Sequence, residues 1–307
     1  MTTRKNPRPA SATQLRGTWL RELVSFPRDP SRIRPESFQK ALWITSHYEG
    51  AGFKNTSGDF DQQGVSLGIL QWCLGQGSLQ PVLRDIFDAV GTDTHKYLQQ
   101  GRALELLDVI KMPITKAVAW GNRISVKRGG KATSLLVQPW KTELENLLTD
   151  PRAIAVQNRW AEAKMRHAAG LCERFGLKTE RALAVAFDVL TQQGSINAGV
   201  EKEIRASWAK LPEGSTERDK LRVLVRVRAS PARKQYIQDV LSRKLTIVEG
   251  HGVVHGTKYD FTKEPGLTDQ PYELASGAIV LPTPASAPKP EPSKPPKDTD
   301  KLPDDFV

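Results

Sequence analysis

Apolar residues recur at helical spacing through most of the first 250 residues of this chain. After Ser37, a candidate N-cap, Phe38, Ala41 and Leu42 follow at helical intervals, and Gly50 supplies a stop. This spacing predicts a helix that begins after Ser37 and ends before Gly50. The same periodicity predicts further helices over residues 78–90, 135–148, 153–175, 179–192, 217–228 and 232–247.

Only one segment has the character of a β-strand. Residues 65–72 form a glycine-punctuated apolar run that could make a small hairpin. The predicted fold class is therefore mainly α (α+β), a helical domain with a small β-hairpin. No unit of 20–50 residues repeats, which argues against solenoids and propellers. No apolar run approaches the roughly 18–20 residues that cross a bilayer, so we expect no membrane span.

Composition divides the chain into three parts. Residues 1–35 form a basic arm with eight Lys or Arg and two acidic residues, without the apolar block of a secretory signal. Residues 36–262 form the predicted domain. Residues 263–307 are predicted to be a largely disordered tail, because seven prolines fall in the fifteen residues 282–296.

Charge and cysteine content narrow the function classes. The 307 residues include 45 Lys or Arg and 34 Asp or Glu, a net charge of +11, which favours polyanionic partners. The only cysteines, Cys73 and Cys172, exclude a disulfide-stapled scaffold and a multi-cysteine zinc site. We predict no metal and no cofactor.

The candidate chemistry begins at Glu49, near the end of the first predicted helix. Eleven residues after Phe38, Glu49 lies on nearly the same helical stripe as the apolar positions, so it faces inward. Partial burial and the negative end of the helix dipole both favour the protonated carboxyl. A general acid needs a proton to donate near neutral pH, so Glu49 is a candidate for that role.

Glycoside hydrolysis also requires a second, ionised carboxylate across the scissile bond. Asp59 and Asp61 are the available partners, in a loop rich in Gly, Ser and Gln that suits a solvated carboxylate. The alternative is structural: Glu49 ends a helix near Lys54, and the two aspartates are turn residues beside Gly58. Periodicity alone does not decide between these interpretations.

The segment from Glu49 to Trp72 resembles the catalytic entrance of family 46 glycoside hydrolases, the chitosanases, and of related peptidoglycan hydrolases of the lysozyme superfamily. The residues that carry the resemblance are Glu49 and the run Gly-Asp-Phe-Asp-Gln-Gln-Gly-Val-Ser-Leu-Gly-Ile-Leu-Gln-Trp. By this resemblance Glu49 matches the general acid, Asp61 the general base, and Ser66 the residue that helps position water. Because the gap between Glu49 and Asp61 is shorter than in chitosanases, Asp59 stays an alternative base.

Two later stretches fit the same superfamily. The run around Asp188 resembles the central buried helix of these enzymes, and the run from Arg243 to Gly256 resembles their C-terminal helix and glycine-rich turn. The resemblance implies that Asp188 and Arg243 form an ion pair that orients Glu49. A buried, unpaired Asp188 would be costly, which also argues for a partner.

Weaker constellations have structural interpretations. His251 and His255 could suggest metal ligands, but the glycines around them favour a turn. Cys73 is interpreted as a small buried residue, and residues 222–228 as a helix whose arginines face solvent or polymer. Four tryptophans are candidates for sugar stacking or, more often, for the core; they are Trp43, Trp72, Trp120 and Trp140.

The leading hypothesis is a lysozyme-like, inverting glycosidase that cuts the glycan of bacterial peptidoglycan, as a phage lysin or an antibacterial effector. The positive charge favours the anionic wall over the polycation chitosan. The alternatives are a chitosanase, or a non-catalytic protein that binds the wall or nucleic acid. No nucleic-acid-binding motif is recognisable, so nucleic acid is the less favoured partner. An immunity or inhibitor protein is a possible partner. Without a classical signal peptide, we expect access to the wall to come from lysis, from a specialised secretion system or from being part of a longer polypeptide.

Overall fold

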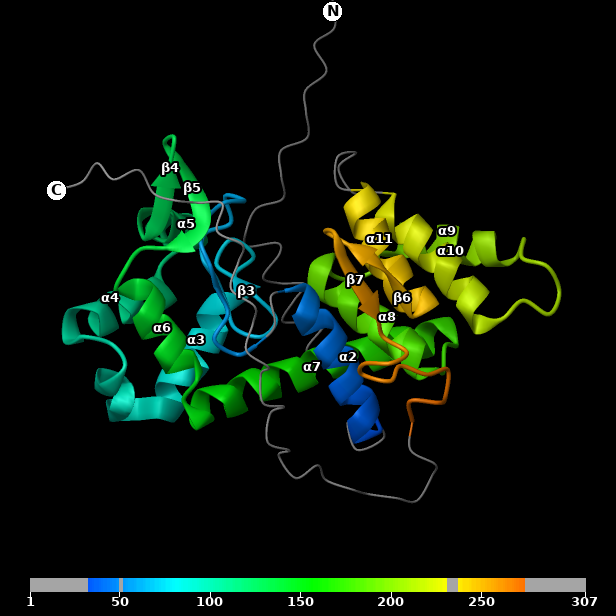
Figure 1. Ribbon diagram of the computed structural model, residues 1–307, viewed down its shortest axis with the longest axis horizontal. Helices are drawn as coiled ribbons and strands as arrows, with labels where there is room; N and C mark the ends of the chain where they lie inside the picture. Colours follow the sequence, from blue (N-terminus) through cyan, green and yellow to red (C-terminus); the bar gives the residue numbers. More distant parts are fainter. Residues whose placement is uncertain (1–32, 50–51, 231–236, 274–307) are drawn as a thin grey trace, which may run out of the picture.

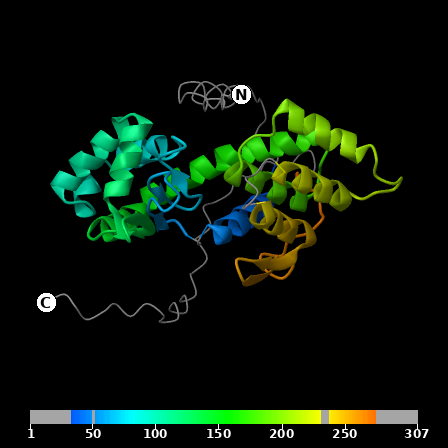
Figure 2. The ribbon, with the colours of Figure 1, turned by 90° about the horizontal axis from the view of Figure 1, so that it is seen from above.

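The computed structural model describes residues 33–49, 52–230 and 237–273. Within these ranges the elements form two groups, joined by the long helix α7 (Pro151–Phe175), which runs beneath both in Figure 1. One group contains α3 to α6 and the strands β1 to β5, and the other contains α8 to α11 with β6 and β7. Figure 2, the view from above, shows the same two groups at the ends of α7.

The described residues are mainly helical, which confirms the predicted fold class. The helices besides α7 are α2 (Pro35–Tyr48), α3 (Leu79–Val90), α4 (Gln100–Lys111), α5 (Ile114–Arg123), α6 (Trp140–Leu148), α8 (Glu180–Gln192), α9 (Ala198–Trp208), α10 (Glu217–Ala229) and α11 (Ile237–Glu249), with a 3₁₀ helix η2 at Gly91–Lys96. The strands are β1 (Thr56–Ser57), β2 (Ser66–Leu67), β3 (Trp72–Cys73), β4 (Ser125–Arg128), β5 (Lys131–Leu136), β6 (His251–Val254) and β7 (Thr257–Asp260).

Most predicted helices form, and three helices were not predicted. These are α4, α5 and α9, of which α9 buries only Ile204 and so has almost no apolar stripe to detect. The predicted helix over 135–148 is wrong at its start, because Pro139 precedes the first turn of α6 and residues 131–136 form β5. The start of the helix predicted over 232–247 lies partly outside the described residues.

The prediction of a single strand region is also wrong. The small hairpin expected there does form, as β2–β3 over residues 66–73, and β1 adds a third antiparallel strand to it. Two further hairpins, β4–β5 and β6–β7, are missed by the sequence pattern because they are largely solvent-exposed. Each turns through two residues with positive φ, Gly129–Gly130 and His255–Gly256, as two-residue hairpins of this hand require.

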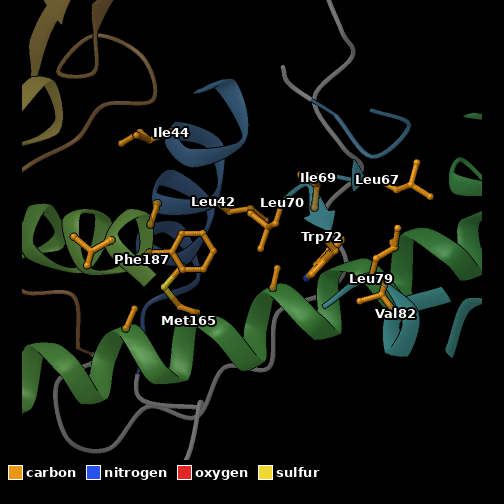
Figure 3. Close-up of a cluster of buried hydrophobic side chains, with 14 of the residues drawn as sticks. Leu42, Ile44, Leu67, Ile69, Leu70, Trp72, Leu79, Val82, Met165 and Phe187 are labelled. Atoms are coloured by element: carbon orange, nitrogen blue, oxygen red, sulfur yellow. The ribbon is translucent and has the colours of Figure 1, made fainter. Parts of the chain in front are cut away.

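The core that positions the candidate site lies where α2, α7 and α8 pack together. All residues of α8 from Glu180 to Val189 are buried, so this helix is the centre of the second group. In Figure 3, Phe187 of α8 lies against Met165 of α7, and Leu42 of α2 points toward Leu70 before β3. This packing fixes the end of α2 relative to α8.

The packed structure continues beyond residue 262, where the predicted domain ends. Leu267 and Tyr272 are buried, and the Arg34 N–H donates to the Tyr272 carbonyl at 2.9 Å. The Thr268 N–H and hydroxyl donate to the buried Glu180 carboxylate. Residues 263–273 therefore belong to the domain, which corrects the expected start of the tail. The proline-rich stretch 282–296 and residues 1–32 of the arm lie outside the described residues.

None of the helices in the described ranges is long and apolar enough to cross a membrane.

Candidate active site

Glu49 caps the C-terminal end of α2, where the sequence places it. Its N–H donates to the carbonyls of Thr45 and Ser46, so its backbone completes the last turn. Its side chain is partly buried, and its Oε1 accepts from Nη2 of Arg243 at 2.7 Å. The Glu49 carboxyl group is thus held by α11 at the boundary between the core and solvent.

Arg243 joins Glu49 to a second carboxylate, Asp188 on α8. The guanidinium donates to Asp188 through Nε at 3.0 Å and through Nη2 at 2.6 Å. Lys244, the next residue of α11, donates from Nζ to Asp188 Oδ2 at 2.6 Å. Burial opposes ionisation of Asp188, but the two cations hold its pKa at about 2. The structure therefore brings Glu49, Asp188 and Arg243 into one chain of ion pairs.

Neighbouring polar groups complete this buried network. Lys244 Nζ also donates to Gln192 Oε1 at 2.6 Å. The Tyr48 hydroxyl donates to the Arg243 carbonyl at 3.1 Å, and the Arg243 guanidinium lies 4.6 Å from the centre of the Tyr48 ring. The sequence analysis missed Lys244, Gln192 and Tyr48. The signal available for Lys244 is its position directly after Arg243 in the predicted C-terminal helix.

Lys164 adds a cation beside Glu49 that the sequence analysis also missed. It lies on α7, and burial of the ammonium group lowers its pKa to about 8, an effect that the charge of Glu49 partly offsets. Glu49 therefore has cationic groups from two helices, Arg243 of α11 and Lys164 of α7, in its surroundings.

Asn55 connects the end of α2 to the small sheet. Its side-chain amide donates to the Glu49 carbonyl, and its own carbonyl accepts from the Gly68 N–H at 2.8 Å. Gly68 directly follows β2, with φ of +81°, and an added Cβ there would collide with Gln157 and Trp72. The turn between β2 and β3 is thereby fixed against both Asn55 and the core.

Asp59 is buried, and its backbone N–H and both carboxylate oxygens form hydrogen bonds within the protein. Oδ1 accepts from the Gly64 N–H at 2.6 Å and Oδ2 accepts from Asn122 Nδ2 at 2.5 Å. Its own N–H donates to the Ser125 hydroxyl at 2.9 Å. Asp59 thus ties the loop before β2 to α5 and β4, and the contacts that do so occupy both oxygens of its carboxylate.

Asp61, two residues later, is exposed. One carboxylate oxygen accepts from the Gln63 N–H at 3.1 Å. Nearby protein atoms displace part of the water around the carboxyl and raise its pKa, and the charge of Asp59 adds to this rise. Ser66 lies in β2 opposite Cys73 of β3, a buried thiol whose pKa is raised by burial and, more weakly, by the charge of Asp61.

The other residues that the sequence analysis considered lie in the core or in side-chain pairs. Trp72, Trp120 and Trp140 are buried in the core, and Trp43 stacks on His47. His255 pairs with Asp239 from the turn of β6–β7. Within the described ranges, no three His, Cys, Asp or Glu side chains gather closely enough to hold a metal ion.

The sequence matches no protein-family model and no curated protein. The structure does match solved ones. A native chitosanase from Bacillus subtilis MY002 superimposes with a TM-score of 0.52 at 17% identity, over 75% of this chain and 97% of that chain. A mutant of that enzyme complexed with six glucosamine units gives 0.52 at 16% identity over the same shares.

A family 46 chitosanase of Gynuella sunshinyii, in complex with chitotetraose, superimposes with a TM-score of 0.50 at 11% identity, over 74% of this chain and 98% of that chain. The chain therefore has the lysozyme-like fold of the family 46 chitosanases. At these identities the likeness concerns the fold, and activity has to be argued from the residues themselves.

Proposed function

We propose that this protein is a glycoside hydrolase that cleaves the glycan of bacterial peptidoglycan. The observation that carries the proposal is Glu49, held by Arg243 and Asp188 at the end of α2 and followed by the exposed Asp61 in the loop before β2. A fold shared with chitosanases supports the same chemistry.

In the proposed reaction, Glu49 protonates the oxygen of the leaving sugar. Asp61 accepts a proton from a water molecule as that water attacks the anomeric carbon, and Ser66 helps to position the water. Two carboxyl groups with a water between them invert the anomeric configuration, at separations of roughly 6.5–9.5 Å. Arg243 and Asp188 orient Glu49 and are positioning residues.

We assign the base to Asp61 rather than to Asp59. A general base needs a lone pair directed at water. Asp61 is exposed and holds one hydrogen bond, whereas both carboxylate oxygens of Asp59 accept hydrogen bonds from the protein. Asp59 then acts as the anchor of the loop that presents Asp61.

The charge of the chain supports an anionic substrate. Chitosan is a polycation, and a surface with a net charge of +11 repels it, whereas the bacterial wall carries carboxylates. Chitosan is the second candidate substrate, because the matched structures are chitosanases.

The test is digestion of three polymers side by side: purified bacterial sacculi, chitosan and chitin. We expect soluble products from sacculi whose masses show cleavage between sugars, and none with the Glu49→Gln protein. Release from chitosan alone would replace the proposed substrate and retain the enzyme class. Products that are cut in the peptide stems, or no products from any polymer, would contradict the proposed function.

A further inference from the structure

An unusual distribution of charge lies beside the Asp61 loop. Residues 109–142 contain seven Lys or Arg and no Asp or Glu, although acidic residues make up 34 of the 307 in the whole chain. This run includes α5, β4 and β5. Its exposed cations are Lys111 at the end of α4, Lys116 and Arg123 of α5, and Lys127, Arg128 and Lys131 of the β4–β5 hairpin.

Two of the seven cations pair with acidic residues that flank the run in sequence, and one of the two is Lys141, which pairs with Glu145 of α6. Arg123 pairs with Glu105 of α4. The hairpin β4–β5 carries three further cations around its Gly129–Gly130 turn, namely Lys127, Arg128 and Lys131. Exposed cations gathered on one hairpin create a positive potential that attracts an anionic polymer.

The hairpin is attached to the loop that carries Asp61. The Gly58 N–H donates to the Ser134 carbonyl of β5 at 2.8 Å, which places β5 beside the end of β1. Asn122 donates to Asp59 at 2.5 Å, and Lys127 donates to the side chain of Asn122. Hydrogen bonds therefore connect the hairpin to the Asp61 loop. In Figure 1, β4 and β5 lie above β3 of the small sheet.

An exposed aromatic ring lies between the two aspartates. Phe60 is 62% exposed, the largest value among the exposed apolar side chains of the described residues. Its N–H donates to the Gly58 carbonyl at 3.0 Å, and the contacts of Asp59 fix the residue before it. Leu135 of β5, next to Ser134, is 46% exposed. An apolar ring exposed to water on an anchored loop suits stacking against the apolar face of a sugar.

We propose that the β4–β5 hairpin and Phe60 form a binding surface for an anionic glycan beside the candidate base. The cations of the hairpin bind carboxylates of the polymer, and the Phe60 ring packs against one of its sugars. This inference rests on the proposed function and names the part of the molecule that selects an anionic amino-sugar polymer. Nucleic acid is the less favoured occupant, because the surface adjoins the loop of Asp61.

The test measures binding without turnover, in the Glu49→Gln protein, by co-sedimentation with insoluble sacculi and with chitosan beads. The hairpin variant is Lys127→Gln with Lys131→Gln. The matched control removes the same charge from the exposed Lys202 and Lys210, on and just after α9. We expect the hairpin variant to bind sacculi about fivefold more weakly at low salt, and the control much less so.

Further arms separate the alternatives. The hairpin difference should shrink at high salt, because exposed charges are screened there. Phe60→Ala should also weaken binding to sacculi about fivefold and Phe60→Trp should restore it, whereas Leu104→Ala, an equally exposed apolar residue of α4, should change nothing. Binding of the hairpin variant to chitosan should be unchanged or stronger, because chitosan is a polycation.

Three results would overturn the inference: equal binding of the hairpin and control variants to sacculi, an unchanged affinity of Phe60→Ala, or a larger hairpin effect on duplex DNA than on sacculi. The proposed function fails separately, if the wild-type protein binds sacculi through this surface and releases no glycan fragments from any polymer.

Discussion

The two candidate carboxylates lie in opposite surroundings. Glu49 touches a buried network in which Arg243 and Lys244 compensate Asp188, all on helices that pack in the core. Asp61 lies on the surface, in a loop anchored by Asp59. One region holds Glu49, the proposed proton donor, by an ion pair and by packing, and the other presents Asp61, the proposed base, to water on a loop anchored by Asp59. An enzyme that attacks one bond from two sides needs this asymmetry.

Replacing Glu49 by a residue that cannot donate a proton is expected to have the largest effect on activity. Glu49→Gln keeps the shape of the side chain but cannot donate a proton, so hydrolysis of sacculi should fall by about 10²–10⁴-fold. The matched control is Glu36→Gln, the same change at an exposed position in the first turn of α2. Near-normal turnover in a folded Glu49→Gln protein would remove Glu49 from this role.

The loop side is tested by exchanging its two aspartates one at a time. Asp61→Asn should lose about 10²–10⁴-fold in turnover with little change in stability, because its side chain is exposed. Asp59→Asn should instead lower the free energy of unfolding by about 1–3 kcal/mol, because it disturbs buried hydrogen bonds. Turnover and urea unfolding measure the two effects.

The same experiment has an independent readout in stereochemistry. If Asp61 activates water, proton NMR of the new reducing ends should show inverted configuration. Retained configuration, or equal turnover in the two Asn variants, would contradict a loop aspartate as the base.

Substitutions in the buried network of Asp188, Arg243 and Lys244 should lower the stability of the fold. Asp188→Asn leaves Arg243 and Lys244 buried with one anion fewer, and removal of one partner from a buried ion pair costs about 3–5 kcal/mol. The control is Asp85→Asn, which removes the charge of a partly exposed pair with Arg159 while an amide oxygen can still accept from Trp160, and it should cost less than about 1 kcal/mol. Equal losses in thermal unfolding would show that the network adds nothing beyond a surface pair.

The same contrast explains what the sequence could predict. Glu49, Asp188 and Arg243 were predictable, because charged residues in apolar helices must find partners and the resemblance indicated which ones. The contact between Lys244 and Asp188 was not predicted, because the direction of the Lys244 side chain depends on how α11 packs against α8. Likewise, the different surroundings of Asp59 and Asp61 were not predicted. They result from the hydrogen bonds of Asp59 to Asn122 and Ser125, which are more than 60 residues away along the chain.

The exposed hairpins show the other limit of prediction. β4–β5 buries little apolar surface, so its strands lack the strong alternation that identifies a strand, and Leu135 and Leu136 instead suggested the start of a helix. Its cations were counted in the net charge, but their position beside Asp61 required the hydrogen bond between Gly58 and Ser134.

The smallest expected effect is on the pH dependence of folding stability, to which Asp188 and Asp61 contribute with opposite signs. The pKa of Asp188 is lowered to about 2, so its charge contributes stability that is fully present above its unfolded pKa of about 4. This stability, about 2–3 kcal/mol in all, is lost as the pH falls from about 4 to about 2. The pKa of Asp61 is raised, so the folded protein binds more protons just above pH 4, and there Asp61 makes stability decrease as the pH rises. Urea unfolding from pH 2 to 6 should therefore show a flatter acid limb for Asp188→Asn and a steeper rise with pH for Asp61→Asn. Carboxyl-carbon NMR titration of the wild-type protein checks both directions without a variant, and a shift of the same sign at both residues would contradict the contrast.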